Sequence, residues 1–373
     1  MNAWYAVENI AEIDSPALLF YPERIERNIQ RTLDIAGGTT RLRPHVKTHK
    51  CAEIVRMQCA AGITKFKCAT IAEAEMATLA GADDVLLAYQ PVGPRAKRWA
   101  RLVSEYGLMA QFACIVDNAA SIRELADLYH PIVGPYRVFL DIDCGQHRTG
   151  VPAGPLAMEL YKQISEDDRL APVGLHVYDG QIHDVDLNQR KAKCDDAFAP
   201  VEALRCELLA AGMSVPTIVA GGTPTFPIHA KRDAALGIEC SPGTNVLWDA
   251  GYAAGCPDLD FDIAALVLTR VLSKPSAGRL CLDLGHKAIA SERPHPRVIF
   301  PALPDCSVVM HNEEHLVIEA ENAADFKVGD ALYGIPWHIC PTVALYQEAN
   351  VVRDGRVQAA AWAITARDRR ITV

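Results

Sequence analysis

Short apolar runs and helix-like segments alternate along the chain from about residue 16 to about residue 243. In the helix-like segments apolar residues recur every three or four positions. One of them, "PERIERNIQRTLDIAGG", closes with two glycines, which is typical of a helix end. The short runs between them, such as "DVLLAY" and "YRVFLDID", are typical of buried strands. Strands separated by helices of roughly 10–15 residues predict parallel βαβ units.

The number of strands favours an α/β fold with a TIM-like (β/α)8 barrel. The eight predicted strands end near Lys47, Thr70, Tyr89, Asp117, Asp143, Tyr178, Gly222 and Gly243. A doubly wound sheet is the structural alternative. After about residue 250 the segments become short, β-rich and separated by turn residues, which predicts a C-terminal β-rich domain. We expect the barrel at residues 22–250 and the β domain at 251–373, with residues 1–21 packed against the β domain.

Composition and charge narrow the functional classes. The chain has 373 residues and a formal net charge of −9, and a nucleic-acid-binding protein would need a basic surface instead. No run approaches the ~18 apolar residues of a membrane span. The N-terminal segment "MNAWYAVENIAEIDSP" carries acidic residues and lacks the apolar core of a signal peptide. The twelve cysteines show no C-x-x-C spacing, so we expect reduced thiols, a cytoplasmic location and no four-cysteine zinc site.

Polar residues gather where the predicted barrel strands end, which is where TIM barrels carry their chemistry. The first strand delivers Lys47, the fifth leads to Arg148, and the sixth to Tyr178 and His183. The seventh and eighth lead to the glycine turns "AGGTPTF" and "SPGTN", whose backbone N–H groups could bind a phosphate. A lysine opposite a phosphate site suggests pyridoxal phosphate (PLP) held as a Schiff base. Each feature alone has a plainer interpretation: a solvated lysine, an ordinary turn, a surface ion pair. Their conjunction at one end of the barrel favours the cofactor.

A second constellation lies in the β domain, in "IPWHICPT". His338 and Cys340 are separated by one residue, so on an extended strand they would point to the same side. Imidazole and thiolate together suit zinc and tolerate other divalent ions, and two protein ligands leave coordination positions open for a substrate. The plainer interpretation is a buried thiol beside a core histidine.

Several motifs resemble one enzyme family over nearly the whole chain. "RPHVKTHK" is similar to the PLP-lysine motif of D-threonine aldolases and eukaryotic-type D-serine dehydratases, the metal-dependent branch of the alanine-racemase-like PLP enzymes. The other matching motifs follow in family order: "LDIDCGQHRTGV", "GLHVYDGQIH", "GGTPT", "SPGTNVLWDAGY", "LCLDLGHKAIASE", "NEEH" and "HICPT". The resemblance implies a TIM-like barrel, a C-terminal β domain and a homodimer. It also implies an active site where the barrel of one subunit meets the β domain of the other.

The resemblance also assigns roles to residues. It implies that Lys47 carries PLP and that His338 and Cys340 bind one divalent metal ion, Zn or Mn, with Mg as a further candidate. The implied cofactor-binding residues are Arg148 and Tyr178 near the ring, and Gly222, Thr223, Gly243 and Thr244 at the phosphate.

The motifs indicate two different reactions. The H-x-C pair resembles the dehydratases, because aldolases of this family often show H-x-D, whereas the barrel loops and "NEEH" resemble the aldolases. We favour retro-aldol cleavage of D-threonine and related D-3-hydroxy amino acids, with His183 as the base at the β-hydroxyl. The first alternative is a dehydratase of D-serine or D-3-hydroxyaspartate, in which Lys47 acts as the base at Cα. An amino-acid racemase and a non-catalytic PLP-binding protein are further alternatives, and the large β domain with H-x-C argues against the latter.

Overall fold

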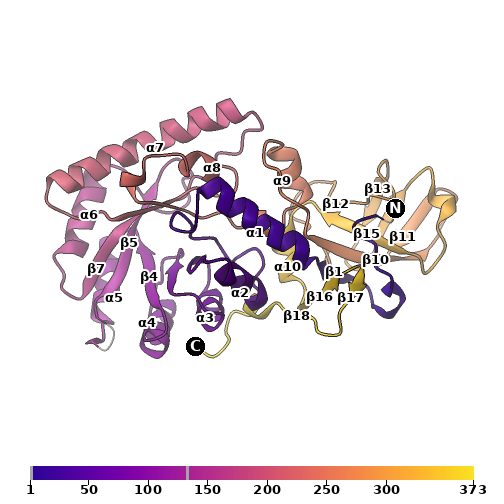
Figure 1. Cartoon of the computed structure of the whole chain (residues 1–373), viewed down its shortest axis with the longest axis horizontal. Coiled ribbons are helices and arrows are strands. Elements are labelled where there is room, and N and C mark those ends of the chain that lie inside the picture. The colour runs from indigo at the N-terminus through magenta and orange to yellow at the C-terminus, as the bar shows by residue number, and fades with distance from the viewer. Residues whose placement is uncertain (1–2, 132–133) are drawn as a thin grey trace. The chain divides into compact units, whose positions relative to one another are not determined.

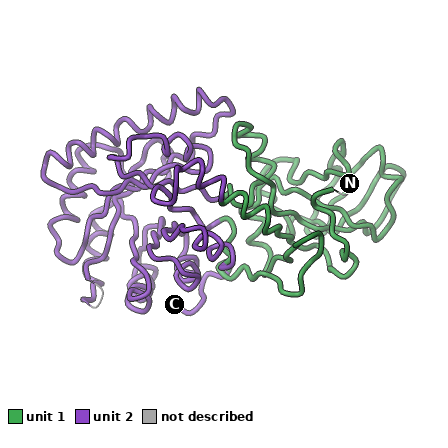
Figure 2. The backbone as a smooth tube through the Cα atoms, in the orientation of Figure 1, with its two compact units in different colours: residues 1–29, 48–51, 244–367 green, residues 30–47, 52–243, 368–373 purple. Residues whose placement is uncertain are grey.

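The computed structural model describes residues 3–131 and 134–373, which fall into two compact units (Figure 2). Unit 1 consists of Met1–Ile29, Thr48–Cys51 and Thr244–Arg367, and unit 2 of Gln30–Lys47, Ala52–Gly243 and Asp368–Val373. Helix α1 (Pro22–Ala36) begins in unit 1 and continues into unit 2 (Figure 1). Two glycines with positive φ, Gly37 and Gly38, follow it and end the helix as the sequence predicts.

Unit 2 contains a parallel sheet in the order β2-β3-β4-β5-β7-β8-β9, with the short β6 beside β5. Its strands are β2 (Lys65–Cys68), β3 (Asp84–Leu87), β4 (Gln111–Val116), β5 (Tyr136–Asp143), β6 (Val151–Pro152), β7 (Leu170–Val177), β8 (Thr217–Ala220) and β9 (Ile238–Cys240). Its helices after α1 are α2 (Ala52–Ala60), α3 (Ile71–Leu79), α4 (Pro94–Tyr106), α5 (Ala119–Asp127), α6 (Pro155–Ser165), α7 (Leu187–Ala210) and α8 (Phe226–His229), with the 3-10 turn η3 (Ala234–Leu236). The predicted α/β fold with a TIM-like barrel is confirmed.

The first predicted strand differs from a regular strand. It forms only two single parallel bridges, Leu42 with Cys240 of β9 and His45 with Lys67 of β2. Pro44 lies between them and has no N–H to donate, so a continuous ladder cannot form there. The bridges nevertheless join the two edge strands of the sheet, and this segment therefore occupies the eighth position of the barrel.

A buried ion network reinforces this closure. Arg43, 1% exposed, donates from Nε to Glu239 at 2.6 Å and from Nη1 to Asp84 at 2.7 Å. These acidic residues belong to β9 and β3, so the guanidinium links the irregular segment to both sides of the ring. The charges of Arg43 and its two partners offset one another, which makes their joint burial tolerable.

Local sequence explains where several helices begin. Thr70 caps α3 by accepting from Glu73 N at 3.1 Å, and Glu73 accepts from Ala69 N at 2.6 Å. This resembles the capping box that T-x-x-E predicts, except that Glu73 accepts from the residue before the cap. Asn118 and Asp186 cap α5 and α7 in the same manner, each by accepting from a backbone N–H three residues ahead.

Unit 1 is built on a sheet whose strands follow the order β13-β14-β11-β10-β1-β16-β17, with β12, β15 and β18 attached to it. The strands are β1 (Ala17–Phe20), β10 (Ala265–Ser273), β11 (Arg279–Leu282), β12 (Val298–Ile299), β13 (Ser307–His311), β14 (Leu316–Glu319), β15 (Ala331–Pro336), β16 (Glu348–Arg353), β17 (Arg356–Val357) and β18 (Trp362–Ala363). The helices are α9 (Ala250–Gly255) and α10 (Ile339–Ala344), and the 3-10 turns are η1 (Ile10–Glu12), η4 (Thr244–Val246), η5 (Ala323–Asp325) and η6 (Thr365–Arg367).

The N-terminal strand is part of this β-rich unit. β1 pairs antiparallel with β10 and parallel with β16, and its four residues are all buried. The last six residues of the chain belong to unit 2 instead. There the carboxylate of Glu75 accepts from the backbone N–H groups of Thr372 and Val373 at 3.0 and 3.3 Å.

All twelve cysteines are free thiols, as expected. Over the described ranges, every helix is too short or too polar to cross a lipid bilayer.

Candidate active site

Three cationic side chains surround the ring of Tyr178 in unit 2. The Nζ atoms of Lys47 and Lys67 lie 5.7 and 5.2 Å from its centroid, and Cζ of Arg148 lies at 5.2 Å. These distances are within the ~6 Å over which a ring face attracts a cation. Lys47 lies in the turn after the His45 bridge, Lys67 in β2, Arg148 in the loop after β5 and Tyr178 directly after β7. The barrel thus brings Lys47, Arg148 and Tyr178 together, as the sequence predicts.

Lys67 was not among the predicted site residues. It is 4% exposed, and burial and then the charge of Lys47 lower its pKa to about 7, against the opposing effect of Asp141 and Asp179. A sequence signal did exist, because Lys67 stands in the short predicted strand "KFKCAT", and a lysine in a buried strand needs a partner. The residue therefore brings a second, readily deprotonated amine to the site.

Asp141 and His176 form a buried pair beside Lys67. His176 Nδ1 lies 2.6 Å from Asp141 Oδ1, and the two residues are register partners on β5 and β7. Burial, and then the charge of Lys67, lowers the pKa of His176, so the imidazole is neutral at neutral pH. Among the described residues, His176 Nε2 and Asp141 Oδ2 are buried without a hydrogen-bond partner. Both atoms are therefore available to a bound molecule.

The two predicted glycine turns lie next to each other. Gly243 N donates to Thr223 Oγ1 at 3.2 Å, and Ser241 N donates to the carbonyl of Gly221 at 2.9 Å. A Cβ at Gly222 would lie 3.2 Å from the ring of Tyr178, a tight contact that glycine avoids. Ser241 Oγ is buried and lacks a partner within the described chain. The turns thus provide a narrow polar cradle beside Tyr178.

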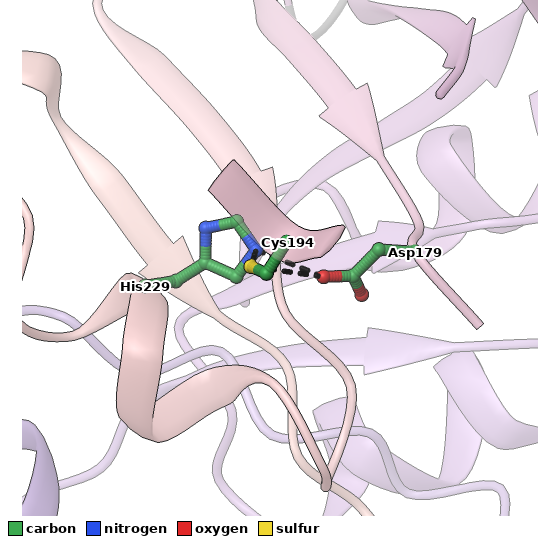
Figure 3. A group of neighbouring side chains, drawn as sticks. All are labelled: Asp179, Cys194 and His229. Atoms are coloured by element: carbon green, nitrogen blue, oxygen red, sulfur yellow. Dashed lines mark hydrogen bonds and ion pairs between the residues drawn. The ribbon is translucent and has the colours of Figure 1, made fainter. Parts of the chain in front are cut away.

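A buried cluster of Asp179, Cys194 and His229 supports this cradle (Figure 3). His229 Nε2 lies 2.9 Å from Asp179 Oδ2 and 3.3 Å from Cys194 Sγ. The other carboxylate oxygen of Asp179 accepts from Gly222 N at 3.3 Å. Since Asp179 also follows Tyr178 in the chain, the cluster fixes the ring and the glycine turn relative to each other.

The same three side chains present donor atoms within 4.8 Å of one another, close enough to share a metal ion. A cation there would face Arg232, whose Nε lies 3.3 Å from His229 Nδ1 and whose Nη2 lies 4.0 Å from Cys194 Sγ. The guanidinium charge opposes a metal ion, and the mutual hydrogen bonds already satisfy the three side chains. We therefore interpret the cluster as a hydrogen-bonded support.

His183 lies apart from this group. It is exposed on the loop between β7 and α7, and no hydrogen bond of its side chain is found within the described ranges. Its role as a base stays a prediction.

The H-x-C pair lies in unit 1, and the prediction that it is on an extended strand is wrong. β15 ends at Pro336, His338 is the N-cap residue of α10, and Cys340 is in the first turn of that helix. The proline after Cys340 fits a first helical turn, where its missing N–H costs nothing. The two side chains are nevertheless hydrogen bonded to each other.

Further donors surround this pair. His338 Nδ1 contacts a carboxylate oxygen of Glu292. Cys340 Sγ lies 3.2 Å from the hydroxyl of Thr48, the residue after Lys47, and 3.4 Å from that of Thr244. Thr244, expected at the cofactor phosphate, thus contacts an expected metal ligand. An imidazole, a thiol and a carboxylate form a donor set that suits a borderline-soft divalent ion.

Comparison with known proteins identifies the family of the chain. Residues 22–236, more than half of its length, match the model of the alanine racemase N-terminal domain. The chain belongs to this family. Residues 264–352 match the serine dehydratase domain model. One relative is the D-threonine aldolase of Arthrobacter sp, which is 31% identical over 96% of this chain and 94% of that protein. Another is the 3-hydroxy-D-aspartate aldolase of Paracoccus denitrificans (strain Pd 1222), which is 28% identical over 96% of this chain and 93% of that protein. Because aldolases and dehydratases of this kind are lyases, this family member is a lyase.

Solved structures agree with this membership. The D-threonine aldolase of Filomicrobium marinum is 29% identical and superposes with a TM-score of 0.89, covering 98% of this chain and 99% of its own. A D-threo-3-hydroxyaspartate dehydratase variant with one cysteine changed to alanine, described as the metal-free form, is 25% identical with a TM-score of 0.81, covering 94% and 97%. In a second variant of that enzyme, the histidine two positions before that cysteine is changed to alanine. This structure is also 25% identical and has a TM-score of 0.79, covering 94% of this chain and 95% of its own.

Proposed function

We propose that this family member is a PLP- and divalent-metal-dependent lyase of D-3-hydroxy amino acids, which cleaves D-threonine to glycine and acetaldehyde. The observation that carries the proposal is the meeting of Lys47, Lys67 and Arg148 around Tyr178, next to the two glycine turns. The similarity to a D-threonine aldolase over nearly the whole chain supports the choice of reaction.

The residues of unit 2 fit PLP. Its phosphate requires polar hydrogens, and the two glycine turns offer Ser241 Oγ, which is buried and lacks a partner within the described chain, beside the backbone of Gly222 and Gly243. Lys47 would hold the cofactor covalently, and the cations around Tyr178 match its anionic groups. When bound, PLP supplies an acceptor for the negative charge that develops at Cα of the amino acid.

The remaining side chains have roles that follow from their charge. Lys67, with a pKa of about 7, adds a positive charge close to Lys47 when protonated and can hold a proton near Tyr178. The neutral imidazole of His176 is oriented by Asp141, which leaves Nε2 free for a polar group of cofactor or substrate.

We propose that His338 and Cys340 hold one divalent ion, with Glu292 as a further donor. The metal-free cysteine variant of the dehydratase and its histidine counterpart, with the same spacing, support this pair. Zn and Mn are the candidates that an imidazole and a thiolate favour, and Mg is less suited. When bound at this pair, such an ion would supply a Lewis acid for the β-hydroxyl of the substrate.

Cleavage of the Cα–Cβ bond requires a base that takes the proton of the β-hydroxyl. We keep His183 for this role, because its exposed loop directly follows Tyr178 and Asp179. The homodimer that the family resemblance implies is likewise part of the proposal, and sedimentation equilibrium of the active protein tests it. An active monomer would contradict it.

Product analysis tests the reaction. With D-threonine, PLP and Mn²⁺, we expect glycine and acetaldehyde in equal amounts, and a steep loss of rate in His183→Asn. Ammonia and 2-oxobutanoate without glycine would indicate the second candidate function, a dehydratase. The H-x-C spacing, which the dehydratase variants share, supports this candidate. Formation of L-allo-threonine alone, by inversion at Cα, would indicate a racemase.

A further inference from the structure

A cavity of about 420 Å³ lies at the C-terminal ends of β2 and β3 in unit 2. It is bordered by the residues after these strands, by α4 and by the C-terminal segment, and its lining residues are Ala69, Thr70, Ile71, Leu87, Tyr89, Arg95, Arg98 and Arg369. Three of these residues are arginines and none is acidic. None of these lining residues has a role in the function proposed above.

In the described part of the chain, no acidic side chain forms an ion pair with these arginines, because no carboxylate of Asp or Glu lies within the 4.0 Å ion-pair distance of Arg95, Arg98 or Arg369. Burial, and then the charges of Arg370 and Arg95, lowers the pKa of Arg98, while Glu75 acts in the opposite direction. In a chain with a net charge of −9, this local excess of positive charge is unusual.

Two of the guanidinium groups are held in place. Arg98 Nη2 donates to the main-chain oxygens of Arg369 and Val373 at 3.0 and 2.7 Å. Its Nε is buried and has no acceptor in the described chain, so one N–H donor remains unsatisfied. Arg95 is positioned by the half-exposed ring of Tyr89, with Cζ 4.6 Å from the centroid. The groups are therefore arranged before any ligand arrives.

The N-terminal end of α3 borders the cavity, but this helix end alone does not make the cavity a binding site. Thr70 and Glu73 already accept the hydrogen bonds of their mutual cap. The charged donors in the lining are the guanidinium groups of the arginines.

We propose that this cavity binds the phosphate group of a small molecule. Guanidinium groups match phosphate oxygens with paired N–H donors, and several of them suit a dianion better than a single carboxylate. The volume falls in the range of about 300–1,000 Å³ that small-ligand sites occupy. The phosphate can come from inorganic phosphate or from a phosphate ester.

Calorimetric titration of the protein loaded with PLP and then freed of unbound PLP tests the proposal, because the bound cofactor keeps phosphate away from the glycine turns. The probes are inorganic phosphate and O-phosphoserine, at constant ionic strength with chloride as the balancing anion. We expect binding of at least one probe, and at least tenfold weaker binding in the double variant R95Q/R369Q. The matched control is R101Q, which removes an exposed arginine of the same helix.

Stronger binding of O-phosphoserine than of phosphate would identify a phosphate ester as the ligand, and the reverse would identify the free ion. Equal binding in the wild type and in R95Q/R369Q would overturn the proposal, as would the absence of heat with both probes. Circular dichroism shows whether the double variant is folded, and a single R369Q variant, which changes an exposed side chain only, repeats the test if it is not. Unchanged binding in that folded single variant, with Arg95 and Arg98 intact, would count against a role for Arg369.

Discussion

The buried amine of Lys67 lies 5.2 Å from the ring centroid of Tyr178, on which Lys47 and Arg148 also converge. Lys67 is thus a second lysine beside the residue that the sequence identifies as the PLP lysine. Its pKa of about 7, against 10.5 for the free side chain, means that its charge changes within the working range of an enzyme.

Lys67→Met removes this charge and should change the pH dependence of stability. Between about pH 7 and 10.5 the unfolded wild-type chain binds a proton that the folded cofactor-free chain does not, so wild-type stability rises with pH in this window. Below pH 7 both states are protonated and the burial cost is fully present. We therefore expect the cofactor-free variant to gain on the order of a few kcal/mol over the wild type near pH 6, and less near pH 9. Urea unfolding at both pH values measures this.

The same variant should bind PLP more weakly, by roughly tenfold, because one cation near the anionic cofactor is lost. Lys97→Met, an exposed control, should leave both properties unchanged. A Lys67→Met protein with wild-type PLP affinity and the wild-type pH profile would contradict the role of Lys67.

Lys47→Ala should abolish covalent attachment of PLP while leaving the fold intact, because the Schiff base requires that amine. Borohydride reduction followed by peptide mass mapping detects the modified lysine, and Lys50→Ala serves as the control. A reduced adduct on Lys67 in the Lys47→Ala protein would show that the neighbouring amine can replace it. An adduct on Lys50 in the wild type would refute the assignment of Lys47.

Asp179→Asn should loosen the glycine turn. The carboxylate accepts from Gly222 N and contacts His229, and the amide cannot accept from both partners with the same strength. We expect PLP affinity to fall by roughly tenfold, with covalent attachment at Lys47 retained. Fluorescence titration with PLP measures the affinity, and Asp168→Asn, an exposed substitution, is the comparison. If both variants bind PLP equally well, Asp179 does not position the turn.

Cys340→Ser and His338→Ala should each lower the metal content of the purified protein, because each removes one of two proposed ligands. Elemental analysis after dialysis against Zn²⁺ or Mn²⁺ measures the stoichiometry. Cys306→Ser, a change of another thiol in unit 1, should retain the ion. Wild-type metal content in both ligand variants would place the ion elsewhere, with Asp179, Cys194 and His229 as the next residues to test.

Arg43→Met should destabilise unit 2 by about 3–5 kcal/mol, because it leaves Glu239 and Asp84 with less compensation for their buried charges. The comparison is Arg56→Met, which breaks an exposed pair with Glu53 and should cost about 0–1 kcal/mol. Chemical unfolding of the two variants under the same conditions gives the difference. Equal losses would show that the network does not hold the barrel closed.

The sequence by itself determined the succession of elements. Helical spacing, capping residues such as Thr70 with Glu73, and apolar strand runs depend on neighbours within a few positions, and these can be seen in the sequence. Strand ends that share one edge of a parallel barrel also allowed Lys47, Arg148 and Tyr178 to be placed together, because that edge follows from topology alone.

Only the tertiary structure decided which polar residues face one another. The pairing of Asp141 with His176 depends on strand register, and the contact of Asp179 with Cys194 and His229 on the packing of α7 and α8 against β7. Pro44 changed the first strand into two bridges, and the H-x-C pair lies in a helix start because β15 ends at Pro336. The charge of Lys67 likewise depends on burial and on four neighbours distant in the sequence, so no local pattern could have assigned its pKa.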